Sequence, residues 1–294
     1  MKTKQSLGET IFDVFNYTFM AALIVVTLYP LLYVLFASIS DPTRLMQTRG
    51  LLWGPVGFSL AAYRRVFENP IILISYRNTL FYVVAGTALN ILMTSLGAYA
   101  LSRRNLLFKT PVTFMIIFTI YFSGGLIPTF LLVGRTLGMM NSPLALIIPP
   151  AVSTINLIIM RTAFEAIPVE LEESARLDGA NDFRILFQII LPLALPTVAV
   201  MILFYAVQHW NSFFPAMVYL RTRELYPLQL ILREILIANS VQDMATGVSS
   251  GDVEMVGETI KYATIVIATL PILCVYPSLQ RYFVKGVMIG ALKG

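Results

Sequence analysis

Six stretches of this sequence lack aspartate, glutamate, lysine and arginine over lengths sufficient to cross a lipid bilayer. A helix needs about 20 apolar residues for one crossing, and lipid offers no hydrogen-bond partner to an unpaired backbone amide. The pattern predicts an all-α, polytopic membrane protein with six transmembrane helices. The stretches are Val14–Ser40, Asn78–Ser102, Thr110–Gly134, Thr136–Met160, Ile185–Leu220 and Tyr262–Gln280.

Composition excludes several other classes of protein. Of the 294 residues, 57% are hydrophobic and only 13% are charged, whereas a soluble domain has about 25% charged residues. The single cysteine, Cys274, has no partner for an internal disulfide. The single histidine, His209, cannot supply the paired ligands of an ordinary zinc site, so we expect no bound metal. The net charge of +5 is spread thinly, which argues against a nucleic-acid partner.

The charge-free stretches divide the chain into a membrane domain, residues 14–280, and two tails, residues 1–13 and 281–294. The first stretch is longer than the apolar region of a signal peptide, about 7–15 residues, so we expect it to stay as a membrane helix. Six crossings place both termini on one side. Lysine and arginine are nearly equal in number on the two sides, but their density in residues 103–110 and in the C-terminal tail favours cytoplasmic termini.

Several of the expected spans are interrupted. Glycine and proline in residues 121–128 break the third stretch, and Pro143 with Pro149-Pro150 breaks the fourth. Such breaks are typical both of a translocation pathway and of ordinary kinks, and the spacing does not separate the two. The end of the fifth stretch, residues 210–220, is expected to be re-entrant or interfacial. Outside the spans, residues 60–67 and 228–237 have the periodicity of amphipathic helices.

The densest charge cluster lies between the fourth and fifth stretches. Eight acidic and basic residues fall within residues 165–184. Pro168 suits the first helical position, and we expect a helix from there to about Leu177, a turn at Asp178-Gly179, and a second helix from residues 180–182 to Leu191-Pro192. Read by itself, this helix–turn–helix is either a projecting contact element or a solvated loop that connects two spans.

The spacing in this loop resembles the EAA loop of ABC importer permeases. Glu173-Ser174-Ala175 is followed by three residues, Gly179, nine residues, Ile189, one residue and Leu191-Pro192. The chain departs from the pattern only at Ser174, which stands where the middle alanine is expected. Over nearly its full length it is similar to carbohydrate-uptake permeases of the maltose (MalG-like) type, particularly those for oligosaccharides, including alginate and aldouronate. The supporting motifs are Leu28-Tyr29-Pro30, Asn78-Thr79-Leu80, residues 123–128, His209-Trp210-Asn211 and residues 280–287 with Lys293-Gly294.

The resemblance implies the type I permease fold of ABC importers, with loop 161–184 on the cytoplasmic side and outer loops at 41–77 and 221–261. It also implies partners: a second homologous permease, two ATPase subunits and a periplasmic or lipid-anchored solute-binding protein, in the bacterial cytoplasmic (inner) membrane among its lipids. The implied ATPase-coupling residues are Glu172, Glu173, Ser174, Ala175, Asp178, Gly179, Ala180, Lys293 and Gly294.

The residues themselves indicate that energy comes from outside the chain. The sequence has no G-x-x-x-x-G-K-[ST] loop to hold nucleotide phosphates, so we expect it to be no enzyme, with ATP and Mg on the partner subunits only. Its charge-free stretches also lack the ionisable relay that a proton-coupled carrier keeps in the membrane. A stand-alone secondary carrier for a small polar solute is the alternative. A membrane-embedded enzyme ranks below both, because clustered acids and bases are missing.

Substrate contacts are expected in the fifth stretch, where aromatic and amide side chains alternate; the transported solute is expected to be an oligosaccharide. Aromatic residues at a membrane interface are the alternative explanation. An arginine-rich outer segment (Arg44, Arg49, Arg64, Arg65 and Arg77) would attract an acidic oligosaccharide. The expected pathway residues are Tyr205, Gln208, Trp210, Asn211 and Phe213.

Overall fold

The computed structural model describes residues 7–48, 50–245 and 259–274. Within these ranges the chain forms helices joined by turns, without a strand; one isolated antiparallel bridge joins Ser40 and Phe58. The predicted all-α class is confirmed for this part of the chain. The chain divides into two compact units, one made of Met1–Asn69 with Glu234–Thr269 and the other of Pro70–Arg233 with Leu270–Gly294.

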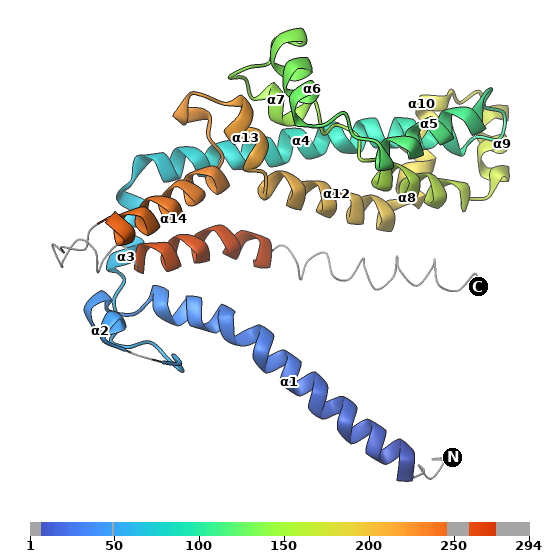
Figure 1. Cartoon of the computed structure of the whole chain (residues 1–294). Coiled ribbons are helices and arrows are strands. Elements are labelled where there is room, and N and C mark those ends of the chain that lie inside the picture. The colour runs from blue at the N-terminus through green and yellow to red at the C-terminus, as the bar shows by residue number, and fades with distance from the viewer. Residues whose placement is uncertain (1–6, 49, 246–258, 275–294) are drawn as a thin grey trace. The chain divides into compact units, whose positions relative to one another are not determined.

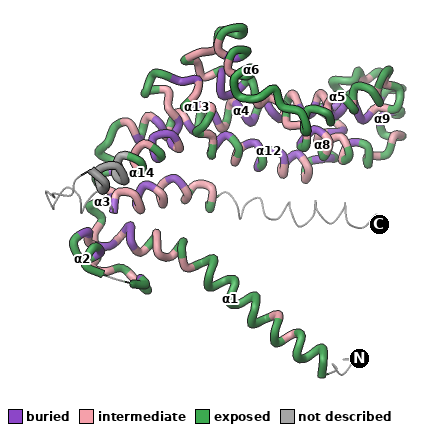
Figure 2. The backbone as a smooth tube through the Cα atoms, in the orientation of Figure 1, coloured by how far each residue is buried: buried purple, intermediate pink, exposed green. Residues whose placement is uncertain are grey.

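The first unit begins with a long apolar helix. α1 (Leu7–Ser38) starts earlier than the predicted Val14, and most of its length is exposed (Figure 1, Figure 2). α2 (Pro42–Gln47) is capped by Asp41, whose side chain accepts a hydrogen bond from the backbone N–H of Arg44 at 3.1 Å. α3 (Ala61–Glu68) confirms the amphipathic helix predicted at residues 60–67, because it buries Ala62 and Val66 and exposes its arginines.

The second unit is organised around α4 (Pro70–Ser102). This helix packs along α12 (Leu195–Trp210) and α8 (Thr154–Glu165), as Figure 1 shows. Ala98, Met160 and Met201 are fully buried in the apolar core that these helices form. The core therefore extends along α4 toward the predicted contact loop.

Polar side chains on α4 cross-link it to other segments of the unit. Asn90 donates from Nδ2 to the carbonyl oxygen of Pro150 at 2.5 Å, and its Oδ1 lies 2.7 Å from Nε2 of His209. Thr94 Oγ1 and Tyr205 Oη are 2.7 Å apart, and Tyr205 Oη also accepts from the N–H of Ser153 at 3.1 Å. These bonds hold the broken backbone at residues 150–153 against two helices, which satisfies polar groups that apolar surroundings would otherwise leave unpaired.

The predicted interruption of the third stretch is confirmed. α5 (Lys109–Tyr121) ends before the glycines, and α6 (Leu126–Leu131) continues as a π-helical turn, η1 (Leu132–Thr136), at 111° to α5. Gly125 has a φ of +82°, a conformation that L side chains rarely adopt, so the bend requires glycine there.

The fourth and fifth stretches are also divided. The fourth forms only the single turn α7 (Leu144–Ile147) before Pro149-Pro150, and α8 follows. In the fifth, the helical segment Asp182–Leu193 meets α12 at 89°. The predicted separate piece at residues 210–220 contains α13 (Phe214–Tyr219). A short 3-10 turn, η3 (Arg223–Leu225), leads to α14 (Leu228–Ala245), which confirms the helical periodicity at 228–237.

Within the described residues, two helices, α1 and α4, are long and apolar enough to cross a membrane, and the number rises to four if each bent pair counts as one span. A shorter apolar helix, Thr259–Cys274, covers part of the sixth predicted stretch; residues 275–280 lie outside the described ranges. The number of six crossings therefore stays a prediction. This number rests on the length of the charge-free stretches. Proline and glycine can divide such a stretch into short helices, so its length does not give the length of a helix.

Candidate functional site

The charged segment forms the helix–turn–helix that its sequence predicts. α9 (Val169–Leu177) follows Pro168, which lies one position before the helix rather than at its first residue. Glu170 and Glu172 occupy the first turn, where carboxylates oppose the positive end of the helix dipole. Gly179 has a φ of +80° and ends the helix, since the N–H of Ala180 then returns to the carbonyl of Ala175 at 2.9 Å.

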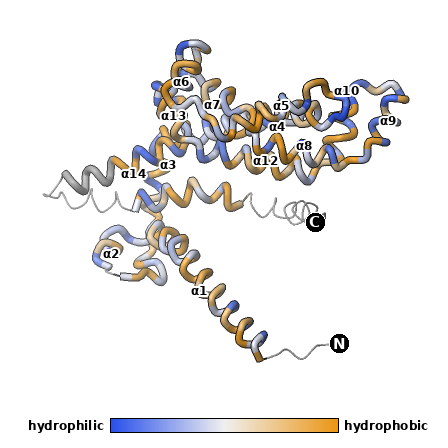
Figure 3. Tube along the Cα trace, turned by 45° about the vertical axis from the view of Figure 1, so that its right-hand side comes forward, coloured by the Kyte–Doolittle hydropathy of each residue, from blue (hydrophilic) through white to orange (hydrophobic). Residues whose placement is uncertain are grey.

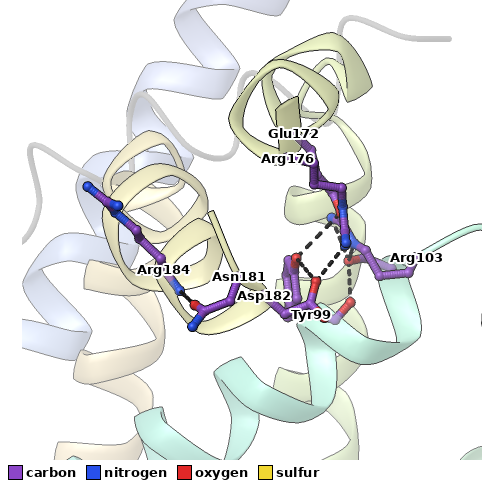
Figure 4. A network of polar contacts seen from close by, with 8 residues as sticks. Tyr99, Arg103, Glu172, Arg176, Asn181, Asp182 and Arg184 are labelled. Atoms are coloured by element: carbon purple, nitrogen blue, oxygen red, sulfur yellow. Dashed lines mark hydrogen bonds and ion pairs between the residues drawn. The ribbon is translucent and has the colours of Figure 1, made fainter. Parts of the chain in front are cut away.

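The second helix is held by a side-chain cap. Asn181 accepts a hydrogen bond from the N–H of Arg184 at 2.8 Å, at the start of α10 (Asp182–Ile185) (Figure 4). The chain continues through a π-helical turn, η2 (Leu186–Ile190), into α11 (Leu191–Leu193). Figure 3 shows hydrophilic residues gathered at α9 and α10, in contrast to the more apolar α12.

The predicted ATPase-coupling residues divide into two groups by exposure. Glu172 and Ala175 are buried, at 6% and 8%. The exposed residues are Glu173, Ser174, Asp178 and Gly179, with Ala180 partly covered; Lys293 and Gly294 lie outside the described residues. One face of α9 therefore turns into the protein, and only the other is available to a partner.

The two most exposed large apolar side chains of residues 165–184 are not among the predicted residues. Leu177 is 90% exposed and Phe183 is 65% exposed, on either side of the Asp178-Gly179 turn. Large apolar side chains at the tip of a charged segment are characteristic of contact surfaces. The signal in the sequence is the apolar residue at each side of the polar turn, but its orientation depends on which face of each helix is buried.

Glu172 lies at the centre of a network that joins α4, α9 and α10 (Figure 4). Its carboxylate pairs with Arg103, directly after α4, and with Arg176 at 3.0 Å. Arg176 also pairs with Asp182 at 2.5 Å. Tyr99 donates weakly to Glu172 at 3.4 Å and to Asp182 at 3.3 Å, and its ring lies under the Arg103 guanidinium at 4.5 Å.

Burial lowers the pKa of Arg103 from its ordinary value. An arginine nevertheless stays charged at neutral pH, so its pairing with Glu172 persists across the physiological range.

A second ion-pair group lies at the end of α8. Glu165 accepts from Lys109 and from Arg161, each at 3.0 Å. Burial raises the pKa of Glu165, but these two hydrogen bonds and the positive charges outweigh it, so the pKa lies below its usual value. A cavity of ≈ 890 Å³ is lined by members of both ion-pair groups: Arg103, Glu172 and Arg176 of the first, and Lys109 and Glu165 of the second. Arg104, Glu170 and Glu173 also line it.

The predicted substrate-pathway residues do not share one surface. Tyr205 is fully buried in the cross-link to Thr94, and Trp210 is buried with its ring edge-on to Tyr76 at 5.8 Å. Asn211 ends α12 and is exposed, and Phe213 lies under Arg233 at 5.8 Å. Of the five, only Gln208 lines a second, more apolar cavity of this unit.

That cavity has a volume of ≈ 660 Å³. It lies where α6, the Pro149-Pro150 break and the end of α12 meet, so the predicted helix interruptions form its wall. Its lining is mainly apolar with a few polar groups, which is the usual composition of a small-molecule site. The polar lining residues are Ser123, Thr129, Gln208, His209, Ser212 and Tyr219. Among the described residues, no group of three metal-ligating side chains occurs.

Comparison with known proteins identifies relatives over almost the whole chain. The family of binding-protein-dependent transport system inner membrane components matches residues 4–289. The polygalacturonan/rhamnogalacturonan transport system permease protein YtcP of Bacillus subtilis is 42% identical over 293 residues, which covers 98% of this chain and 100% of that protein. Protein LplC of the same organism is 40% identical over 284 residues, 97% of this chain and 95% of the relative.

A solved structure has the same fold. One chain of a bacterial ABC transporter involved in the import of the acidic polysaccharide alginate superposes with a TM-score of 0.86 at 35% sequence identity. The match covers 96% of this chain and 100% of that chain. The similarity therefore includes the charged segment, the broken helices and the α4 scaffold together.

Proposed function

We propose a function from one premise: this chain belongs to the family of binding-protein-dependent transport system inner membrane components. It is the permease subunit of an ABC importer, and it carries a saccharide across the membrane. The observation that supports this most strongly is the match over nearly the full length to saccharide permeases. The helix–turn–helix at α9 and α10, with its exposed apolar tip, is the element through which such a subunit can be driven.

ATP hydrolysis takes place on two partner ATPase subunits, with Mg bound there. The exposed face of α9 and the tip formed by Leu177 and Phe183 contact one of them. In this proposal loop 161–184 and both termini lie in the cytoplasm, outer loops 41–77 and 221–261 lie on the opposite side, and residues 14–280 cross the membrane six times. The C-terminal Lys293 and Gly294 form a second ATPase contact.

The remaining partners are a second, homologous permease and a solute-binding protein, periplasmic or lipid-anchored, which delivers substrate at the outer face. The substrate is an oligosaccharide, and the relatives favour an acidic one, because the solved transporter imports an acidic polysaccharide. Arg44, Arg64, Arg65 and Arg77 are each exposed, as long-range attraction of an anion requires. The ≈ 660 Å³ cavity beside Gln208 is the candidate position for a sugar unit.

The contact with the ATPase is tested with two exposed leucines. Leu177→Ser removes the apolar tip, and we expect it to lower the amount of ATPase that co-purifies with the complex by about tenfold, as truncation of an interface anchor does. Leu107→Ser is the matched control, since Leu107 is 82% exposed on the turn between α4 and α5. Gly179→Asp, which alters the turn between the two helices, is expected to act like Leu177→Ser.

Uptake is measured in proteoliposomes that contain the complete complex and its binding protein, with an acidic oligouronate and a neutral oligosaccharide of equal length. Equal ATPase recovery from Leu177→Ser and Leu107→Ser would contradict the proposed contact. Accumulation of substrate by vesicles that hold this chain alone, under an ion gradient without ATP, would instead indicate a stand-alone carrier.

A further inference from the structure

Glu172 is placed unlike its neighbour Glu173. Both are glutamates in α9, yet Glu172 is 6% exposed and Glu173 lies on the exposed face. Ala175, one turn after Glu172, is buried as well. A side chain that is turned into the protein and already paired is not available to a partner subunit, so Glu172 has a different role from the exposed residues of the segment.

Both oxygens of the Glu172 carboxylate are occupied within this chain. Oε2 pairs with Arg103, which follows α4, and Oε1 pairs with Arg176 on α9 itself. Arg176 continues the network to Asp182 at the start of α10. One carboxylate thus joins the long scaffold helix to the first helix of the charged segment, and through a single arginine to the second (Figure 4).

A charge pair in this position is sensitive to the loss of either partner. A buried carboxylate without a counter-charge is strongly unfavourable, whereas an intact pair mainly fixes the relative geometry of the groups that carry it. Ala175 and Ile185 share an apolar core with Tyr99 at the end of α4. The Tyr99 hydroxyl lies 3.4 Å from Glu172 and 3.3 Å from Asp182. The pair with Arg103 adds a charged link to this packing. The ion pair is therefore suited to transmit a displacement between α9 and α4.

We propose that Glu172 is a positioning residue for transport: through Arg103 it makes the ATPase-contacting segment and α4 move as one body. This inference rests on the proposed contact between α9 and an ATPase. A movement imposed on α9 then reaches the cross-links at Asn90 and Thr94, and with them the helix breaks around the ≈ 660 Å³ cavity. Without the pair, ATP hydrolysis continues but moves less substrate.

The test compares Glu172→Gln with Glu165→Gln in the complete complex, reconstituted with its binding protein. The measured quantity is the number of substrate molecules imported per ATP hydrolysed. Glu172→Gln is expected to lower this ratio by about tenfold, within the usual range of coupling between sites, while ATPase subunits still co-purify. Glu165→Gln removes an ion-paired carboxylate at the end of α8, outside the proposed ATPase contact, and is expected to leave the ratio unchanged.

A rescue experiment separates positioning from a loss of folding. Arg103→Cys with Glu172→Cys is made in a Cys274→Ser background, because Cys274 is the single native cysteine. A short bis-maleimide that joins the two thiols replaces the ion pair with a covalent tie, and we expect it to restore the import ratio that the double variant has lost. An unchanged ratio in Glu172→Gln, or a cross-link that abolishes import, would overturn the inference. Loss of ATPase binding by the wild-type chain would instead refute the proposed function.

Discussion

α1 and α4 are almost equal in length, at 32 and 33 residues, and each is apolar enough to cross a membrane. They differ in what they bury. None of the most apolar window of α1 is buried, against 33% for α4. The buried set on α4 includes the polar residues Ser75, Thr79, Asn90, Thr94 and Ser95.

This difference separates a helix that faces its surroundings from one that organises a fold. An apolar side chain can face lipid without penalty, whereas a buried polar group must find a partner inside the protein. Asn90 and Thr94 bond to α12 and to the Pro149-Pro150 break, and Thr79 accepts from the N–H of Leu228, after η3, at 2.8 Å. Of the set, Ser75 Oγ has no hydrogen-bond partner among the described residues. Hydropathy alone does not distinguish the two helices, but the positions of their partners do.

The largest expected effect is at Gly86 of α4, which faces the His209 ring of α12. A Cβ atom on Gly86 would lie 2.4 Å from Nε2 of His209, a ring that Asn90 holds in place. Alanine gains about 1 kcal/mol of helix propensity, but crowding of a fixed ring costs about 3 kcal/mol, so Gly86→Ala is expected to destabilise the chain by about 2 kcal/mol.

Gly97→Ala on the same helix is the control. Its nearest contact would be Cδ1 of Leu157 at 3.0 Å, the end of a flexible side chain, so we expect little net change. Thermal unfolding of the full-length chain in detergent measures both. If Gly86→Ala and Gly97→Ala unfolded at the same midpoint temperature, the added methyl group at Gly86 would be accommodated by a small separation of α4 from α12.

A smaller effect is expected from a matched pair of threonines, one on each long helix. Thr94→Val leaves the buried hydroxyl of Tyr205 with one partner fewer and should cost about 1–2 kcal/mol. Thr27→Val on α1 should change stability by less than about 0.5 kcal/mol, because the Thr27 hydroxyl bonds within its own helix, to the carbonyls of Leu23 at 2.7 Å and Ile24 at 3.2 Å. A loss at Thr27 as large as that at Thr94 would contradict the assignment of α4, and not α1, as the scaffold.

The smallest effect lies outside both helices, at Glu165. The pKa of this carboxyl is lowered in the folded chain, so its stabilising contribution is present above the unfolded pKa and is lost as pH falls through the folded pKa. Side-chain exposures of 22–34% in this group keep the contribution small. We expect the wild type to be slightly more stable than Glu165→Gln at pH 7, with the difference disappearing in acid. If the stability difference between the two proteins grew as the pH fell, the pKa of Glu165 would be raised on folding and not lowered.

Much of the charged segment could be predicted from its sequence. The turn at Asp178-Gly179, the end of α9 at Leu177 and the start of the second helix follow from local preferences, because glycine alone readily adopts the φ of +80° found there. The family was also recognisable from spacing. The roles within the segment were not: Glu172 and Glu173 are adjacent and identical, and only packing against Arg103 places one inside.

The substrate residues show the same limit. In the sequence, similar amphipathic character is shared by Tyr205, Gln208 and Trp210. In the structure, Tyr205 and Trp210 are buried between packed helices, whereas Gln208 lines a cavity. Tyr205 and Trp210, five apart on the helix, point in different directions, whereas Tyr205 and Gln208, three apart, lie on one face. The sequence does not state which of these side chains packs against a neighbour.

The sequence by itself determined that this chain is a helical membrane protein, where its helices break, and which segment is charged, because charge absence, proline and glycine act locally. The tertiary structure decided which long helix is the scaffold and which glutamate is internal. Those properties depend on partners such as Arg103 and Glu172, which are far apart in the chain and meet only when the helices pack. Local chemistry specifies the elements, and only their packing specifies which side chains remain free to act.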